Sequence, residues 1–167
     1  RNPHYNHYLF ESIAILVRSV CSRHPEQTQS FEALLFPPFQ TVLQMDVLEF
    51  TPYVFQVFAQ LLEYRPNEAG LGESYSMLLP PLLMPILWEK KGNIPALTRL
   101  IQAYLKKAAN EIVAQGLLQG IMGIFQKLVS SKANEVNAFE ILKYVFLFVE
   151  AESMEVYLQD LFRILVM

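Results

Sequence analysis

The sequence predicts an all-α fold in which pairs of helices stack as repeats. Residues 31–39 (FEALLFPPF) and 75–83 (YSMLLPPLL) are near-copies that begin forty-four residues apart, and each contains a proline pair. A second apolar segment with helical spacing follows each copy. A period of roughly forty to forty-seven residues with two helices per unit is typical of HEAT and armadillo solenoids. We therefore expect an α-α superhelix, specifically a HEAT-repeat solenoid segment of about eight helices.

Each helix is expected where apolar residues recur with helical spacing between breaking residues. The expected ranges are about 6–22, 31–44, 47–64, 75–88, 94–108, 111–129, 138–149 and 154–166. His24 and Pro25 end the first helix, because a residue before proline avoids the helical conformation. Pro37 and Pro38 should bend the second helix, since each removes a backbone donor. Asp46 then lies in the turn that leads to the third helix.

The later boundaries follow from the same kind of punctuation. Residues 65–72 contain a proline and two glycines and form the most loop-like stretch of the chain. Residues 89–92 separate the fourth helix from the fifth, for which Asn93 is a plausible N-cap and Pro95 lies in the first turn. The last range repeats the pattern of residues 75–80 in weaker form. Proline-containing and uninterrupted helices are thus expected to alternate.

The composition predicts one continuous array. Hydrophobic residues make up 53% of the 167 residues and charged residues only 17%, against about 25% charged in an ordinary soluble domain. Natural solenoids close their ends with polar capping repeats, and neither end of this sequence has that character. We therefore expect residues 1–167 to form a single HEAT-repeat segment of about four helix pairs, uncapped at both ends and cut from a longer solenoid.

The inner surface of the superhelix is the expected binding surface. In HEAT units the proline-broken helix is ordinarily the convex one, which assigns the concave side to residues 6–22, 47–64, 94–107 and 138–149. We call the predicted outward polar side chains of these helices the polar stripe; its candidate partner-binding residues are Glu49, Gln56, Gln60, Glu63, Arg99, Gln102 and Lys106. The last three offer donors to an acidic partner, and the first four offer acceptors to a basic one. The alternative is an exposed face that only confers solubility.

Other function classes find little support in the sequence. His7 with Glu11, and Cys21 with His24, have ligand-like spacings but lack further ligands, so no metal site is expected. No nucleophile with a paired base and no phosphate-binding loop is present, so neither an enzyme nor a cofactor site is expected. The net charge of −3 argues against nucleic-acid binding. The longest apolar run, residues 77–88, contains three prolines and is too short to insert in a membrane.

Several stretches resemble the importin-alpha re-exporters, a family of exportins in the importin-beta superfamily. They are residues 6–13 (NHYLFESI), 49–57 (EFTPYVFQV), 93–103 (NIPALTRLIQA) and 123–133 (GIFQKLVSSKA) with Phe139. The resemblance implies a nuclear export receptor that binds importin-alpha together with the GTP-bound Ran GTPase, shuttles between nucleus and cytoplasm, and has nuclear pore proteins as further candidate partners. The amino-terminal repeats of that family are missing here, and residues 109–120 fit it less well. A HEAT scaffold of another karyopherin, or of a large regulatory assembly, is the alternative.

Overall fold

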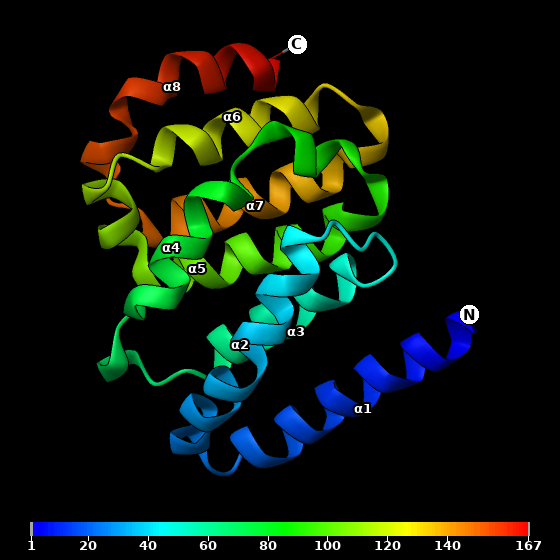
Figure 1. The fold of residues 1–167 in the computed structure, drawn as a ribbon. Helices are drawn as coiled ribbons and strands as arrows, with labels where there is room; N and C mark the ends of the chain where they lie inside the picture. Colours follow the sequence, from blue (N-terminus) through cyan, green and yellow to red (C-terminus); the bar gives the residue numbers. More distant parts are fainter. Residues whose placement is uncertain (1, 167) are drawn as a thin grey trace.

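The computed structural model describes residues 2–166, and within that range the chain contains helices and no strands (Figure 1). The α-helices are α1 (Pro3–Cys21), α2 (Thr28–Gln44), α3 (Thr51–Tyr64), α4 (Gly72–Leu82), α5 (Ile94–Ala114), α6 (Leu118–Val129), α7 (Glu135–Phe148) and α8 (Ala151–Val166). Short 3-10 helices connect them: η1 (Pro25–Gln27), η2 (Asn67–Ala69), η3 (Pro85–Glu89), η4 (Lys91–Asn93) and η5 (Lys132–Asn134). The predictions of an all-α fold and of eight helices are confirmed.

The helices form two layers. Helices α1, α3, α5 and α7 contact one another in succession and make up the first layer, while α2 packs on α3 and α6 packs on α7 in the second layer (Figure 1). The helices predicted as concave therefore all belong to the first layer. This arrangement of stacked pairs, each in contact mainly with its neighbours, is that of a helical solenoid.

Helix α3 lies at the centre of the core because its apolar residues point in several directions at once. Val54, Phe55, Phe58 and Leu61 are all fully buried. Phe58 also meets the second layer, with its ring 4.6 Å from that of Phe36 in α2. A helix that is apolar around most of its circumference has to be covered on most sides, and contacts with α1, α2 and α5 cover this one.

The turn between α2 and α3 is longer than expected, and α3 begins at Thr51 rather than near residue 47. Asp46 adopts a positive φ of 49° there, a conformation that Asp tolerates better than most residues. The Thr51 hydroxyl donates to the carbonyl of Val47 at 3.0 Å. A side chain that bonds a nearby carbonyl competes with regular helix, and it helps the chain to turn before the helix starts.

Helix α4 ends at Leu82, six residues earlier than expected. Met84 precedes Pro85 and is extended, with φ −69° and ψ 125°, as the steric demand of a following proline requires. The chain then continues as the 3-10 helix η3, in which Trp88 is buried. The indole N–H of Trp88 donates to the carbonyl of Leu82 at 2.9 Å, so the tryptophan satisfies an acceptor at the end of α4.

The boundary between the fifth and sixth helices lies later than expected. Helix α5 continues to Ala114, and the predicted break is only a kink at Ala108, with φ −148° and ψ 39°. The chain turns instead at Gly116, where φ is 71°, a value that glycine adopts at no steric cost. Gly120 then allows α6 to approach Leu83, because a Cβ there would lie only 3.0 Å from the leucine side chain.

Candidate functional site

The structure places six of the seven predicted stripe residues at or near the surface of the first layer. Gln56, Glu63, Arg99 and Lys106 are exposed on α3 and α5, and Gln102 is half-buried on α5. Glu49 is also exposed, but it lies in the turn before α3. Polar side chains of the neighbouring helices α3 and α5 therefore lie at the surface of this layer.

The prediction that Gln60 faces outward is wrong. Its side chain is only 7% exposed, because α1 packs across this part of α3. Its amide donates to the carbonyl of Ala14 in α1 at 2.8 Å, while its Oε1 is buried without a hydrogen-bond partner among the described residues. Gln60 therefore joins two repeats and is not accessible to a partner. Helical spacing could not reveal this, since it does not show where the neighbouring repeat lies.

Glu63 and Arg99 form a bidentate ion pair between α3 and α5. The guanidinium Nε and one terminal nitrogen lie 2.7 Å and 2.9 Å from the two carboxylate oxygens. The hydrogen bonds to Glu63 raise the pKa of Arg99 above its usual value, so the arginine is charged at every physiological pH. Bidentate geometry fixes the orientation of both groups. Within this structure the pair is a bridge between repeats, and Arg99 is not a free cation.

Similar polar contacts join every neighbouring pair of helices in the first layer. Asn6 in α1 donates to Glu49, in the turn before α3, at 3.4 Å. Between α5 and α7, Gln102 donates to the carbonyl and to the carboxylate of Glu140, both at 3.2 Å. The partners are separated by 36 to 46 residues along the chain, which is about one repeat. Most of the polar stripe is thus a ladder of contacts between repeats, a role that the spacing of polar residues does not predict.

Gln56 and Lys106 are the stripe residues for which the described part of the chain provides no hydrogen-bonding or ionic partner. Each borders a hollow beside the Glu63–Arg99 pair. One hollow, of about 310 Å³, lies between α1, α3 and α5 and includes Gln56 and Arg18. The other, of about 400 Å³, includes Lys106 and Tyr144 of α7. These two residues are the part of the predicted set that remains free to contact a partner.

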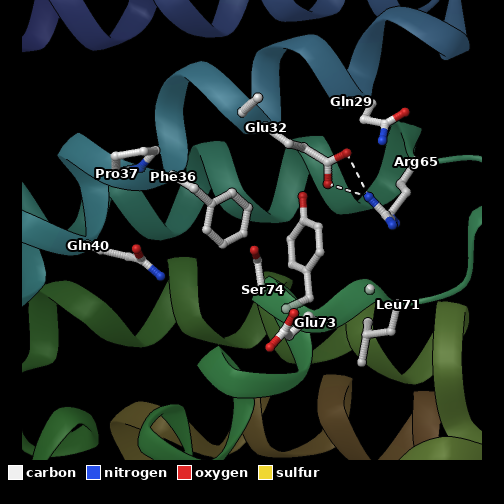
Figure 2. A pocket seen from close by; sticks show the side chains of 12 residues that line it. Gln29, Glu32, Phe36, Pro37, Gln40, Arg65, Leu71, Glu73 and Ser74 are labelled. Atoms are coloured by element: carbon white, nitrogen blue, oxygen red, sulfur yellow. Dashed lines mark hydrogen bonds and ion pairs between the residues drawn. The ribbon is translucent and has the colours of Figure 1, made fainter.

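A second polar cluster lies between α2 and α4 and was not predicted. Arg65, in the loop after α3, places one terminal nitrogen 2.8 Å from both carboxylate oxygens of Glu32 (Figure 2). The side chains of both residues are largely buried, with 14% and 8% exposed. The same arginine stacks over the ring of Tyr75, with its central carbon 5.5 Å from the ring centroid. The only sequence signal was the loop-like character of residues 65–72.

Residues 2–166 contain no group of three or more His, Cys, Asp or Glu side chains that could hold a metal ion. His7 and Glu11 lie 3.8 Å apart on one turn of α1, and Cys21 is a buried free thiol. Within the same range no helix has the length and apolar character that a bilayer crossing requires.

Stacked helix pairs with a polar face along one layer define a helical-repeat binding protein of the HEAT type. The protein-family model described as the C-terminus of CAS/CSE proteins matches residues 1–167. The chain therefore belongs to the CAS/CSE family.

Known relatives agree with this assignment. The chain is 47% identical over 165 residues to Exportin-2 of Danio rerio, 44% identical over 165 residues to Exportin-2 of Homo sapiens, and 42% identical over 163 residues to Exportin-2 of Drosophila melanogaster. In each case 98% of this chain is covered, and the chain spans only 17% of the relative. A solved structure of the exportin Cse1 in its cargo-free, cytoplasmic state matches with a TM-score of 0.90 and 35% identity, over 99% of this chain and 17% of that one.

Proposed function

We propose that this chain forms part of a nuclear export receptor that binds importin-alpha together with GTP-bound Ran and carries it from the nucleus to the cytoplasm. The similarity to proteins called Exportin-2 over 98% of the chain is the observation that carries the proposal. On this proposal the chain acts by binding alone, and the hydrolysis of GTP belongs to Ran. The receptor shuttles through the nuclear pore, with pore proteins as further partners.

The first layer is the surface that we assign to the cargo complex. Its polar side chains follow one another over α3 and α5, with a hollow on either side of the Glu63–Arg99 pair. A partner can meet such a face with many separate polar contacts, which favour specificity and rapid association more than affinity. High affinity then requires several repeats acting together, so the segment contributes a part of a larger interface.

Capture of importin-alpha by a full-length receptor that contains this segment tests the proposal. Receptor on beads should retain importin-alpha when Ran is loaded with a non-hydrolysable GTP analogue, and should retain much less when Ran carries GDP. The dependence on the nucleotide separates an exportin from a general scaffold. Equal capture with both nucleotides, or no capture with either, would contradict the proposed function.

The role of the polar stripe can be tested within the same receptor. The side chain of Lys106 is exposed and has no ionic partner in the described residues. The substitution Lys106→Glu should slow association about two- to fivefold at low salt, as expected for an exposed charge pair. The difference should shrink as salt rises. The control is Lys132→Glu, which changes another exposed lysine, on η5. Equal association rates for both variants would exclude Lys106 as a contact.

Arg99 needs a different design because it already binds Glu63. The single change Arg99→Glu places two carboxylates together and perturbs the bridge between repeats, so a loss of binding would be ambiguous. The exchange Glu63→Arg with Arg99→Glu restores an ion pair of the same composition. If Arg99 also contacts the partner, the exchange should keep the melting temperature and still weaken assembly. Full assembly by the exchanged protein would show that the pair is only a bridge.

A further inference from the structure

Two hollows of the first layer share Arg99 in their linings. The first, of about 310 Å³, is also lined by Arg18 of α1 and Tyr64 of α3, and the second, of about 400 Å³, by Lys106 of α5 and Tyr144 of α7. The proposed function places a partner on this layer but leaves open what that partner offers to it. The groups that the chain leaves unused around the two hollows indicate the answer.

The carboxylates around the hollows are largely occupied by the chain itself. Glu63 binds Arg99 through both of its oxygens, and the carboxylate of Glu140 accepts a hydrogen bond from an amide side chain of α5 at 3.2 Å. Glu11, in the first hollow, lies 3.8 Å from Nε2 of His7. A basic segment of a partner would therefore have to break existing contacts to find acceptors here.

Donors, by contrast, remain free in both hollows. Arg18 is exposed, and no hydrogen bond or ion pair joins its side chain to another residue within 2–166. The same holds for Lys106 in the second hollow. Arg99 uses Nε and one terminal nitrogen for Glu63, so its other terminal nitrogen is unbound in the described part of the chain. Three cations thus line the two hollows against two carboxylates, one of which Arg99 already neutralises.

The chemistry of these donors suits carboxylates. A guanidinium carries five donors in a fixed plane, and hydrogen bonds between ionised groups are about twice as strong as neutral ones. The phenol groups of Tyr64 and Tyr144 are partly buried beside the hollows and can each donate a further hydrogen bond. A carboxylate therefore finds complementary donors in either hollow.

The spacing of the cations indicates the form of the partner. Arg99 and Lys106 are seven residues apart on α5, which places them about 10 Å apart along one face of the helix. In an extended chain of the polyproline II type, side chains three positions apart lie on the same side and about 9 Å from each other. Acidic side chains at every third position of an extended segment would therefore match the spacing along this layer.

We propose that the two hollows bind an extended acidic segment of the partner. Arg18 binds one carboxylate at the first hollow and Lys106 binds another at the second, while the free nitrogen of Arg99 lies at the border of both. Such a site rests on the proposed function, since it needs a partner on the first layer, and it specifies the chemistry of that partner's surface. The net charge of the chain, −3, disfavours nucleic acid as the source of the negative charge.

An acidic peptide tests the site on a full-length receptor that contains this segment. The probe is an acetylated, amidated heptapeptide with glutamate at its first, fourth and seventh positions and glycine elsewhere, and the control peptide has glutamine at those positions. Ligand-observed NMR at low salt should show binding of the glutamate peptide at least about threefold tighter than that of the glutamine peptide, because only the charged groups gain the stronger bonds. Equal binding of the two peptides would overturn the proposal.

Variants of the receptor identify the two hollows. Arg18→Gln and Lys106→Gln should each weaken binding of the glutamate peptide about threefold, and together about tenfold, because the two residues lie in separate hollows and act independently. The control pair Arg23→Gln with Lys132→Gln removes the same charge from exposed residues outside both hollows and should have no effect. Unchanged binding in the double variant of Arg18 and Lys106, or an equal loss in the control pair, would contradict the acidic site.

The same receptors separate this site from the proposed function. Capture of importin-alpha with GTP-loaded Ran should fall about threefold or more at low salt in the double variant of Arg18 and Lys106. Capture that depends on the nucleotide but is unchanged in the double variant would overturn the acidic site and leave the export function standing. Peptide binding that depends on Arg18 and Lys106, in a receptor whose capture ignores the nucleotide, would support the site and contradict the export function.

Discussion

The two proline-containing helices α2 and α4 share a sequence pattern but end differently. Helix α2 passes through Pro37 and Pro38 and continues for six more residues to Gln44. Helix α4 passes through Pro80 and Pro81 and ends one residue later, at Leu82. A proline pair within a helix thus does not decide by itself where that helix ends.

The difference comes from one position in the repeat. Forty-four residues before Pro85 the sequence has Thr41, which remains helical and whose hydroxyl donates to the carbonyl of Pro37 at 3.1 Å. A hydroxyl that donates to the carbonyl four residues earlier leaves a helix intact, although it often bends the helix. In the second copy Pro85 forces Met84 out of the helical conformation, and Trp88 then caps the end of α4. The third proline, rather than the proline pair, therefore ends α4.

The largest loss of stability is expected when Trp88 is replaced. Trp88 has no counterpart in α2, because Gln44 occupies the corresponding position. Replacing Trp88→Ala removes a buried ring and leaves the Leu82 carbonyl without its donor. The free energy of unfolding should fall by about 3–5 kcal/mol. Urea denaturation of the chain measures this change, and the exposed Gln44→Ala is the control, with an expected change within about 0.5 kcal/mol. A loss below about 1 kcal/mol for Trp88→Ala would show that the tryptophan does not hold this end of α4.

The next effect tests the third proline directly. Thr41→Pro should make α2 end as α4 does and should cost about 3 kcal/mol, because a proline removes a helix bond and displaces the residue before it. Hydrogen exchange should show faster exchange of the amides of residues 42–45. Thr41→Ala removes only the side-chain bond at an exposed site and should change stability by less than about 1 kcal/mol. Equal effects of the two substitutions would show that a proline at position 41 does not end α2.

The two repeats should also differ in alkaline solution. Burial raises the pKa of Tyr104, and burial together with Glu32 raises that of Tyr75, whereas Phe31 corresponds to Tyr75 in α2. In the unfolded chain these tyrosines ionise near a pH of about 10, while the folded state keeps them protonated. Their contribution to stability is therefore complete below that pH and is lost above it, by about 1.4 kcal/mol per pH unit for each tyrosine.

Denaturation at a series of pH values between neutral and strongly alkaline measures this loss. Tyr75→Phe, which makes α4 resemble α2 at this position, should reduce the slope above the tyrosine pKa by about half. Tyr104→Phe should do the same and should also remove the bond from its hydroxyl to the Tyr75 carbonyl at 2.7 Å, at a cost of about 1 kcal/mol at neutral pH. An unchanged slope in both variants would show that other groups control the alkaline response.

The smallest effect concerns the turns that follow α2 and α4. Asp46 and Lys90 occupy corresponding positions forty-four residues apart, and the lysine nitrogen lies 2.8 Å from the aspartate. Both side chains are substantially exposed, so Lys90→Ala should cost less than about 1 kcal/mol. The cost should vanish in high salt if charge attraction causes it. A cost that persists in high salt would indicate that packing of the lysine stem matters instead.

Residue patterns alone determined the class of fold. The repeated proline motif and the helical spacing of apolar residues predicted eight helices and their alternation, because both patterns depend on local propensity and on the period of the helix. They also placed the four helices predicted as concave in one layer, since α1, α3, α5 and α7 contact one another in succession. The boundaries at Leu82 and Ala114 were missed, because prolines and glycines act through the conformation of their neighbours as well as their own.

The roles of the polar residues were decided only by the tertiary structure. The sequence shows that Gln60, Glu63 and Arg99 are polar and regularly spaced, but not that α1 covers the first or that the other two bind each other. The same holds for Glu32 and Arg65, which are thirty-three residues apart and meet in the interior. Helical spacing fixes the face on which a side chain lies. The packing of one repeat on the next decides whether that face meets solvent, a partner or the chain itself, because burial and pairing depend on residues about one repeat away.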